Sequence, residues 1–431
     1  MDMHPSARLE RVLPELIDEL AEAHTPDYLE AAIERASSRP QRPAWTFPER
    51  WLPMDTVATA QVPTARFPMR ALGILALIAL LIAGAFIVYT GAQSTPAPPF
   101  GLAENGHIAI VSNGDLRAVD QVTGEVTDLV TGPEDDAHPV FSLDGTRLAF
   151  QRRIDASTSH VLVAASDGTD ATVVTPEPLT DVRTIRFSPT TDQVLIEAAR
   201  DGVPSFALVG IDGSGFDWLA IDGPAERAAF VPDGGAIVFV TKAADGGEGL
   251  ARFDFETGQT TELLAAVPQS FIVGPPSMSP DGQGFAFGFW VNNGNATGNA
   301  RIYTMPVDGS ATHSMIPAPL DICCQANPAW SNDGTRIASQ RIYGDRQVVA
   351  TYDATDGGTA IEFVAPSDVP DITVAWSPDD RYVLATYWSA YASGSERTTE
   401  LQHVVIDATN GALVESAWDN QGPASWQRVG R

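Results

Sequence analysis

The sequence predicts an all-β fold, a seven-bladed β-propeller, preceded by an α-helical cytoplasmic segment and one transmembrane helix. Three observations lead to this prediction: a turn motif recurs six times, one stretch of twenty residues carries no charge, and a strand-like segment at the C-terminus has no following strand to pair with. The expected parts are a helical segment with a Pro/Trp-rich juxtamembrane linker (1–70), a transmembrane helix (71–90), a tether (91–104) and the propeller (105–431).

The composition narrows the classes of function. The chain carries 26 Lys and Arg against 55 Asp and Glu, a formal net charge of −29. Binding to nucleic acid depends on clustered cations that neutralise phosphate, so no nucleic-acid partner is expected. The two cysteines, Cys323 and Cys324, are adjacent, so no disulfide framework holds the fold. A chain of this length can bury enough apolar surface to fold without covalent links.

The apolar stretch 71–90, ALGILALIALLIAGAFIVYT, predicts the transmembrane helix. Twenty helical residues span a hydrocarbon core of about 30 Å. Arg66 and Arg70 precede the stretch, and no Lys or Arg follows it until Arg117. The positive-inside rule therefore places the N-terminus in the cytoplasm and the propeller outside the membrane. The prolines of residues 92–100 are typical of a semi-rigid tether.

The first seventy residues predict two short helices, for which a cytoplasmic protein is one of two candidate contacts. Apolar residues at helical spacing predict an amphipathic helix over 6–23, and Thr25 with Pro26 begins a second. Two short helices bury little alone, so they dock on each other or offer an apolar stripe to a partner. The stretches TPDY (25–28) and PAW…WLP (43–53) resemble the N-termini of bacterial single-pass proteins associated with extracytoplasmic-function sigma factors, but no zinc-binding His/Cys pattern is present.

One motif returns along the C-terminal part of the chain: an aromatic residue, Ser, Pro-Asp-Gly or a close variant, two residues, and an apolar run. Its copies lie 43 to 52 positions apart. A period in the forties, made of short strands, is typical of four-stranded propeller blades, which bury their faces only between neighbouring blades. The copies begin at Phe141, Phe187, Phe230, Met278, Trp330 and Trp376.

Each part of the motif has a physical role. The aromatic residue ends an inner strand, Pro sets φ, Asp hydrogen-bonds the backbone, and Gly adopts the left-handed conformation that closes the turn. The turn residues are Asp144, Gly145, Asp233, Gly234, Asp281, Gly282, Asp333, Gly334 and Asp379. The copies resemble the WD40-like (PD40) repeats of the bacterial TolB family over residues 105–431. This resemblance implies the propeller fold and, for function, a cell-envelope scaffold with protein partners.

The blade count depends on how the ring closes. Residues 107–130 supply three strands with no motif strand before them, and Trp426 lies in a motif-like strand with nothing after it. Together these segments make one complete blade, which also removes the open sheet edges. Six motifs and this composite blade predict seven blades, and six blades are the alternative.

Three groups of residues are candidate sites. Cys323 and Cys324, expected in a loop between blades, form a vicinal disulfide or remain two thiols. A long Asn/Gly loop is the expected binding loop. Asp135, Asp136 and His138 are expected to form a solvated acidic turn rather than a cation site. The residues of the binding loop are Asn292, Asn293, Asn295 and Asn299.

The sequence favours binding over catalysis. It contains no nucleophile elbow, no paired carboxylates at catalytic spacing and no clustered metal ligands, so no catalytic residue, metal or cofactor is expected. We expect a sensor-like module that binds a small ligand or a protein at the propeller face. The alternatives are a cell-envelope scaffold of the TolB type and a propeller hydrolase.

Overall fold

The computed structural model describes residues 97–291, 300–311, 313–344, 346–365, 372–393, 396–414 and 422–430, without the side chains of residues 291 and 388–402. The chain divides into two compact units, Met1–Ile87 and Val88–Arg431. The predicted cytoplasmic helices and the transmembrane helix lie outside the described residues. Within the described part of the chain, no helix is long and apolar enough to cross a membrane.

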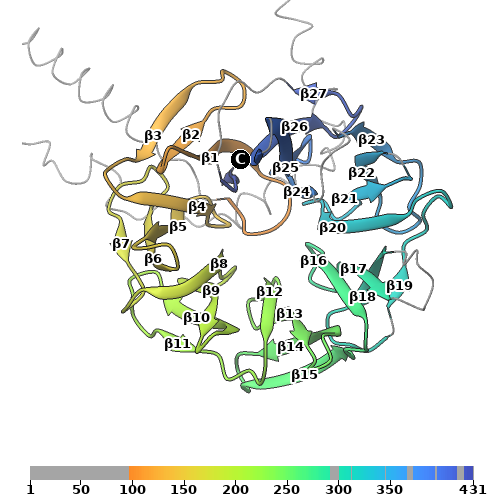
Figure 1. The fold of residues 1–431 in the computed structure, drawn as a ribbon, viewed down its shortest axis with the longest axis horizontal. Coiled ribbons are helices and arrows are strands. Elements are labelled where there is room, and N and C mark those ends of the chain that lie inside the picture. Colours follow the sequence, from red (N-terminus) through yellow and green to blue (C-terminus); the bar gives the residue numbers. More distant parts are fainter. Residues whose placement is uncertain are drawn as a thin grey trace, which may run out of the picture. The chain divides into compact units, whose positions relative to one another are not determined.

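The described residues of the second unit form antiparallel strands in groups of four, arranged around a ring (Figure 1). One group combines both ends of this unit: β28 (Ser425–Val429), β1 (Glu104–Ser112), β2 (Asp115–Val119) and β3 (Val126–Val130). The next two groups are joined into one sheet by pairing of β6 with β8. They are β4 (Asp135–Phe141), β5 (Arg147–Arg153), β6 (Thr158–Ala165), β7 (Thr172–Val173), β8 (Leu179–Phe187), β9 (Gln193–Arg200), β10 (Val203–Gly210) and β11 (Asp217–Trp218).

Three further groups complete the series. The first holds β12 (Ala225–Phe230), β13 (Ala236–Lys242), β14 (Glu248–Asp254) and β15 (Gln259–Leu264). The second holds β16 (Ser270–Met278), β17 (Gly284–Val291), β18 (Arg301–Pro306) and β19 (Ser314–Met315). The third holds β20 (Cys324–Trp330), β21 (Arg336–Ile342), β22 (Gln347–Asp353) and β23 (Ile361–Val364).

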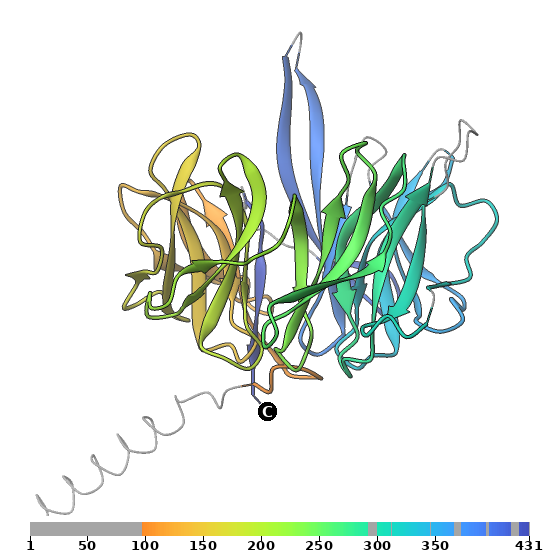
Figure 2. The same cartoon turned by 90° about the horizontal axis from the view of Figure 1, so that it is seen from below.

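The last group, β24 (Ile372–Trp376), β25 (Tyr382–Ser393), β26 (Glu396–Asp407) and β27 (Leu413–Val414), includes two long strands. Their hairpin rises from one face of the ring, and β28 ends at the opposite face (Figure 2). In the six groups that contain a motif copy, the motif strand is innermost and ends at the motif's first residue, as the repeat predicts.

Burial follows from the stacking of the groups. The second strands β5, β13 and β21 each contain four or five consecutive buried residues, because a neighbouring group covers each of their faces. The outer strands β3 and β15 are mostly exposed. The hydrophobic clusters accordingly extend across neighbouring groups, as where Ile110 of β1 packs with Leu384 of β25. This arrangement is a β-propeller.

The two ends of the second unit close the ring, as the sequence predicts. β28 pairs antiparallel with β1, and Ile108 lies opposite Trp426. The Trp426 ring stacks on Tyr382 of the neighbouring group at a centroid distance of 6.4 Å. The closing strand is therefore held by backbone hydrogen bonds on one side and by aromatic packing on the other.

Candidate functional site

The inner strands enclose a central channel, and several of them share a local irregularity. In β4, β8, β12 and β20 the pairing register shifts at a non-glycine residue with positive φ: His138 (52°), Asp181 (52°), Arg227 (56°) and Asn327 (51°). A non-glycine residue in this region is uncommon and is found often at functional sites.

Two of these residues hold neighbouring groups together. Arg227 donates from Nη1 to the carbonyl of Ile272, and Asn327 donates from Nδ2 to the carbonyl of Ile372 at 2.8 Å. The His138 side chain starts from the same position but makes no hydrogen bond with any described residue. Its backbone conformation is retained without the side-chain contact between groups that Arg227 and Asn327 make, and the Asp181 side chain pairs instead with Arg183 of its own strand.

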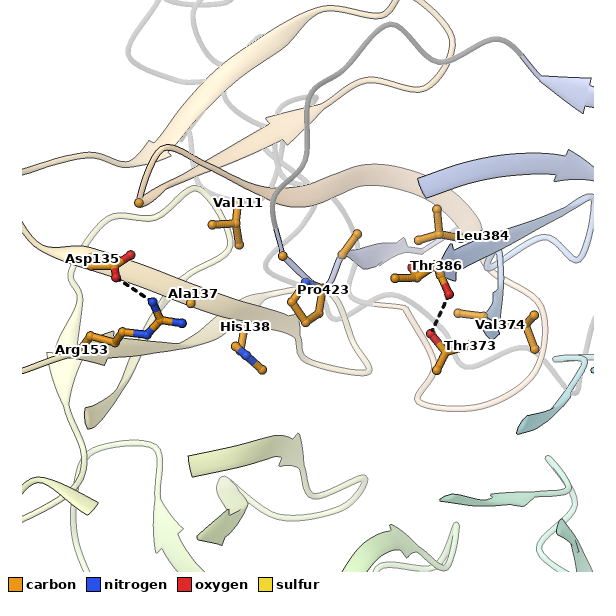
Figure 3. Close-up of a pocket in the computed structure, with 14 residues that line it drawn as sticks. Val111, Asp135, Ala137, His138, Arg153, Thr373, Val374, Leu384, Thr386 and Pro423 are labelled. Atoms are coloured by element: carbon orange, nitrogen blue, oxygen red, sulfur yellow. Dashed lines mark hydrogen bonds and ion pairs between the residues drawn. The ribbon is translucent and has the colours of Figure 1, made fainter. Parts of the chain in front are cut away.

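His138 instead lines a cavity of about 500 Å³ at one end of the channel (Figure 3). The walls come from β1, β4 and β5, from β24 and β25, and from the residues that lead into β28, so three segments distant in sequence meet there. The volume lies within the range of ligand pockets, which is roughly 300–1,000 Å³.

One wall of the cavity is polar. Arg153 donates from Nη1 to Asp135 Oδ2 at 2.9 Å, and His138 lies beside this pair (Figure 3). Burial lowers the pKa of His138, and the positive charge of Arg153 lowers it further. The imidazole is therefore neutral at pH 7, with one nitrogen that donates and one that accepts.

The opposite wall is mixed. Val374 and Leu384 contribute apolar surface, and Thr373 donates from Oγ1 to the carbonyl of Thr386 at 3.5 Å (Figure 3). Thr386 Oγ1 lies 2.8 Å from Nδ1 of His403, behind the wall. Burial lowers the pKa of His403 to about 4, so this histidine is also neutral at pH 7. A few polar groups set in apolar surface are typical of sites that orient a ligand.

The other end of the channel is covered by residues 97–103, part of the predicted tether, which we call the strap. The strap binds the ring through its backbone: Ala97 N–H donates to Asp144 O at 3.0 Å, and Ala103 N–H donates to Pro378 O at 2.9 Å. Phe100 lines a second cavity of the channel, of about 340 Å³. Val374 lines both cavities, so the two adjoin within the channel.

The predicted turn residues surround the strap end of the ring. In the Met278 copy, Asp281 accepts hydrogen bonds from Ser279 Oγ (2.6 Å) and Gln283 N–H (3.0 Å), and the serine hydroxyl is the main cause of the lowered pKa of Asp281. Asp144, Asp233, Asp333 and Asp379 accept equivalent backbone bonds from the residue two positions on. The glycines at 145, 234, 282 and 334 have φ between 71° and 75°. At Gly145 a Cβ would also lie 1.7 Å from Arg428 O, inside van der Waals contact.

The sixth copy has Asp380 in place of this glycine, with φ of 59°. Its buried carboxylate accepts from Asn332 N–H (2.9 Å), Asn332 Nδ2 (2.8 Å) and Asp333 N–H (2.8 Å). Burial raises the pKa of Asp380. The aspartate thus links two neighbouring turns, a role that the repeat pattern did not indicate.

The acidic pair before His138 is not a solvated turn, contrary to expectation. Asp135 and Asp136 begin β4 and lie opposite Arg153 and Arg152 of β5. Asp136 is 2 % exposed and forms a two-pronged ion pair with Arg152, with both N–O distances 2.8 Å. Among the described residues no group of three or more His, Cys, Asp or Glu side chains is placed to hold a metal ion.

The two cysteines lie at the start of β20. Cys323 precedes the strand and Cys324 is its first residue, so only Cys323 belongs to the expected loop. Their Sγ atoms are 3.0 Å apart as free thiols, and the disulfide stays a prediction. Arg301 fixes the preceding backbone by donating to Cys323 O (2.8 Å) and Ile322 O (3.0 Å). The expected binding loop, Asn292 to Asn299, lies outside the described residues.

No family model matches the sequence, and the search of curated proteins found no match. The chain is similar to the solved β-propeller domain of the Trilobed protease from Pyrococcus furiosus, with TM-score 0.50 and 12% identity over 75% of this chain and 97% of that chain. It is also similar to an oligogalacturonate lyase in complex with manganese, with TM-score 0.51 and 14% identity over 75% and 85%. A TolB structure from Agrobacterium tumefaciens matches with TM-score 0.46 and 19% identity over 66% and 99%. The first two similarities confirm the propeller fold and, at such identities, the fold alone.

Proposed function

We propose that this chain is a membrane-anchored, extracytoplasmic binding module, sensor-like, which takes a small ligand or a protein segment into the open end of its channel. One observation carries the proposal: His138 keeps the strained inner-strand conformation, lacks the contact that Arg227 and Asn327 make between groups, and faces a cavity. A strained backbone conformation at a residue whose side chain makes no stabilising contact favours a role in binding.

The finer architecture belongs to the same proposal. The described strands number 28 and fall into groups of four, which supports seven blades over six. Arg66 and Arg70 before the apolar stretch 71–90 support a single span with the propeller outside a bacterial membrane. Protease added to intact spheroplasts should digest the propeller, and protection of the propeller would contradict this topology.

Binding without catalysis fits the chemistry around the cavity. Asp135 is committed to Arg153, and His138 has no described group within hydrogen-bond distance with which to form a nucleophile and base. Purified protein should therefore show no turnover on peptide, ester, glycoside or lactone panels. Turnover that His138→Asn abolishes would favour the hydrolase alternative, because Asn tolerates the left-handed backbone and removes only the imidazole.

The binding site is tested by filling the cavity. Full-length protein is screened by thermal shift against amino acids, short peptides, sugars and small acids, and the affinity of any stabilising compound is measured by titration. Ala375→Trp places a large ring in the cavity and should weaken binding at least tenfold. Val122→Trp is the control, because Val122 is 94% exposed in a turn between outer strands and does not line the cavity. Equal losses in both variants, or none in Ala375→Trp, would place the site elsewhere.

A further inference from the structure

Strand β8 places a cation in the channel where the other inner strands have small or uncharged residues. Arg186 directly precedes the motif residue Phe187 and lines the 340 Å³ cavity. No other motif strand has a charged residue at this position. The corresponding residues of the other motif strands are Val140, Ala229, Ser277, Ala329, Ala375 and, in β28, Ser425.

The polar residues at this position in other strands have structural partners. Ser277 Oγ accepts from the backbone N–H of Trp330 at 2.8 Å, and Ser425 Oγ accepts from that of Phe141 at 3.0 Å. Each serine therefore joins its strand to the next group. The Arg186 side chain has no such contact: it makes no hydrogen bond or ion pair with any described residue, and its Nε is buried.

The acidic side chain that acts on Arg186 is already engaged. Glu197 accepts at Oε2 from Thr184 Oγ1 (3.1 Å) and from the backbone N–H of Arg227 (3.0 Å). Its charge counteracts the effect of burial on the pKa of Arg186, which is lowered. A guanidinium stays protonated at any pH at which the protein is folded. The channel therefore holds a permanent positive charge with unused donors.

The rest of this cavity is apolar apart from Ser277, whose hydroxyl is bonded to Trp330. Its walls include Phe100 of the strap, Phe187, Phe230, Met278 and Pro328. A guanidinium binds a carboxylate through two parallel hydrogen bonds, and the bond is strong where water is excluded. Apolar walls favour an apolar ligand body and penalise the extra charge of a phosphate.

We propose that Arg186 binds the carboxylate of a ligand whose apolar body fills this cavity. The carboxylate belongs to a small free acid or to the C-terminus of a peptide that ends in an apolar residue. This assignment rests on the proposed binding function and specifies its ligand chemistry.

The test compares an acid with its neutral analogue. Calorimetric titration of the full chain uses 4-phenylbutyrate and 4-phenylbutanamide, which have the same shape. The acid should bind at least tenfold more tightly than the amide, and Arg186→Ala should remove that preference by weakening the acid at least tenfold. Alanine already occupies this position in β12 and β20, so the variant should fold. Arg186→Lys should retain part of the preference, because it keeps the charge and loses the two-pronged geometry.

The matched control is Arg183→Ala on the same strand. Arg183 is ion-paired with Asp181 and Glu226, both at 2.8 Å, and does not line the cavity. This variant should keep the acid affinity within twofold. Acetyl-Phe-Phe with a free or an amidated C-terminus tests in the same way whether the ligand is a peptide. If the peptide with the free carboxylate binds and phenylbutyrate does not, the site takes peptide C-termini. If phenylbutyrate binds and the peptide does not, the site takes small acids.

Equal binding of acid and amide, unchanged acid affinity in Arg186→Ala, or no binding of any acid would overturn the assignment. The proposed function is judged separately by the cavity-filling variant Ala375→Trp. If that variant loses panel ligands while Arg186→Ala does not, the channel binds ligands but Arg186 does not select carboxylates.

Discussion

Replacing Arg428 by Met tests how the closing strand is held in the ring. Arg428 of β28 is buried and donates from Nη1 to Asn332 Oδ1 at 2.6 Å. Its Nη2 donates to the strap carbonyls of Pro98 (3.1 Å) and Gly101 (2.6 Å). Asn332 in turn donates to Asp380, so one polar network joins the closing strand, the strap and two motif turns.

The expected loss follows from these contacts. Met keeps the apolar stem of Arg428 and removes three hydrogen bonds from a charged donor, each worth about 1.5–3 kcal/mol. Part of this loss is offset, because the variant has no guanidinium to transfer out of water on folding. The same desolvation lowers the pKa of Arg428 in the folded protein. Removal of one partner from a buried charged network should lower the free energy of unfolding by about 2–4 kcal/mol.

Urea denaturation, followed by tryptophan fluorescence, measures this loss. The control is Arg147→Met, since Arg147 is exposed, and that variant should stay within about 0.5 kcal/mol of the wild type. A double-mutant cycle with Asn332→Ala should give a coupling of about 1–2 kcal/mol. If Arg428→Met matches the control, or the coupling is zero, the network does not hold the ring closed.

Three further predictions concern single features of the chain. Asp333→Ala removes an acceptor for the backbone N–H and hydroxyl of Thr335 (2.9 and 2.8 Å) and should cost about 1–2 kcal/mol in urea denaturation; no loss would mean that the turn closes without its aspartate. His403 stays neutral in the folded state down to a pKa of about 4, whereas the unfolded chain binds this proton below pH 6.5, so stability falls as pH drops from about 6.5 to 4. His403→Leu should lose less stability over that window, and parallel pH profiles would refute this. Exported protein alkylated before reduction should be two hydrogens lighter at Cys323 and Cys324 than the dithiol form; full alkylation without reductant excludes the bridge.

The fold was predictable because its determinants are local. Six of the inner strands end at a motif residue such as Phe141 or Trp376, and the following turn depends on side chains within five positions. The closing pair β1 and β28 followed from the strand left over at Trp426. The start of β4 was missed because Asp135 and Asp136 become strand residues only through arginines on β5, a pairing that their own neighbourhood does not show.

The site was less predictable than the fold. No short motif contains His138 or Arg186. Each stands out only because its side chain lacks the hydrogen bonds that residues at the same position of some other strands make. Aligning the six copies by position would have shown Arg186 among small residues, but only the structure shows that it lacks a partner. The role of Asp380 was not predictable for a related reason. In the sequence, Asp in place of the motif's Gly looks like a tolerated change, and only the structure shows its contacts with Asn332.

The measurement that tests the central claim most directly is an experimental structure of the full chain with the tightest compound from the thermal-shift panel. The compound should lie inside the channel, between β4, β8 and β24, in contact with His138 or Arg186. A compound bound to the outer strands or the β25–β26 hairpin, with both channel cavities empty, would contradict this claim.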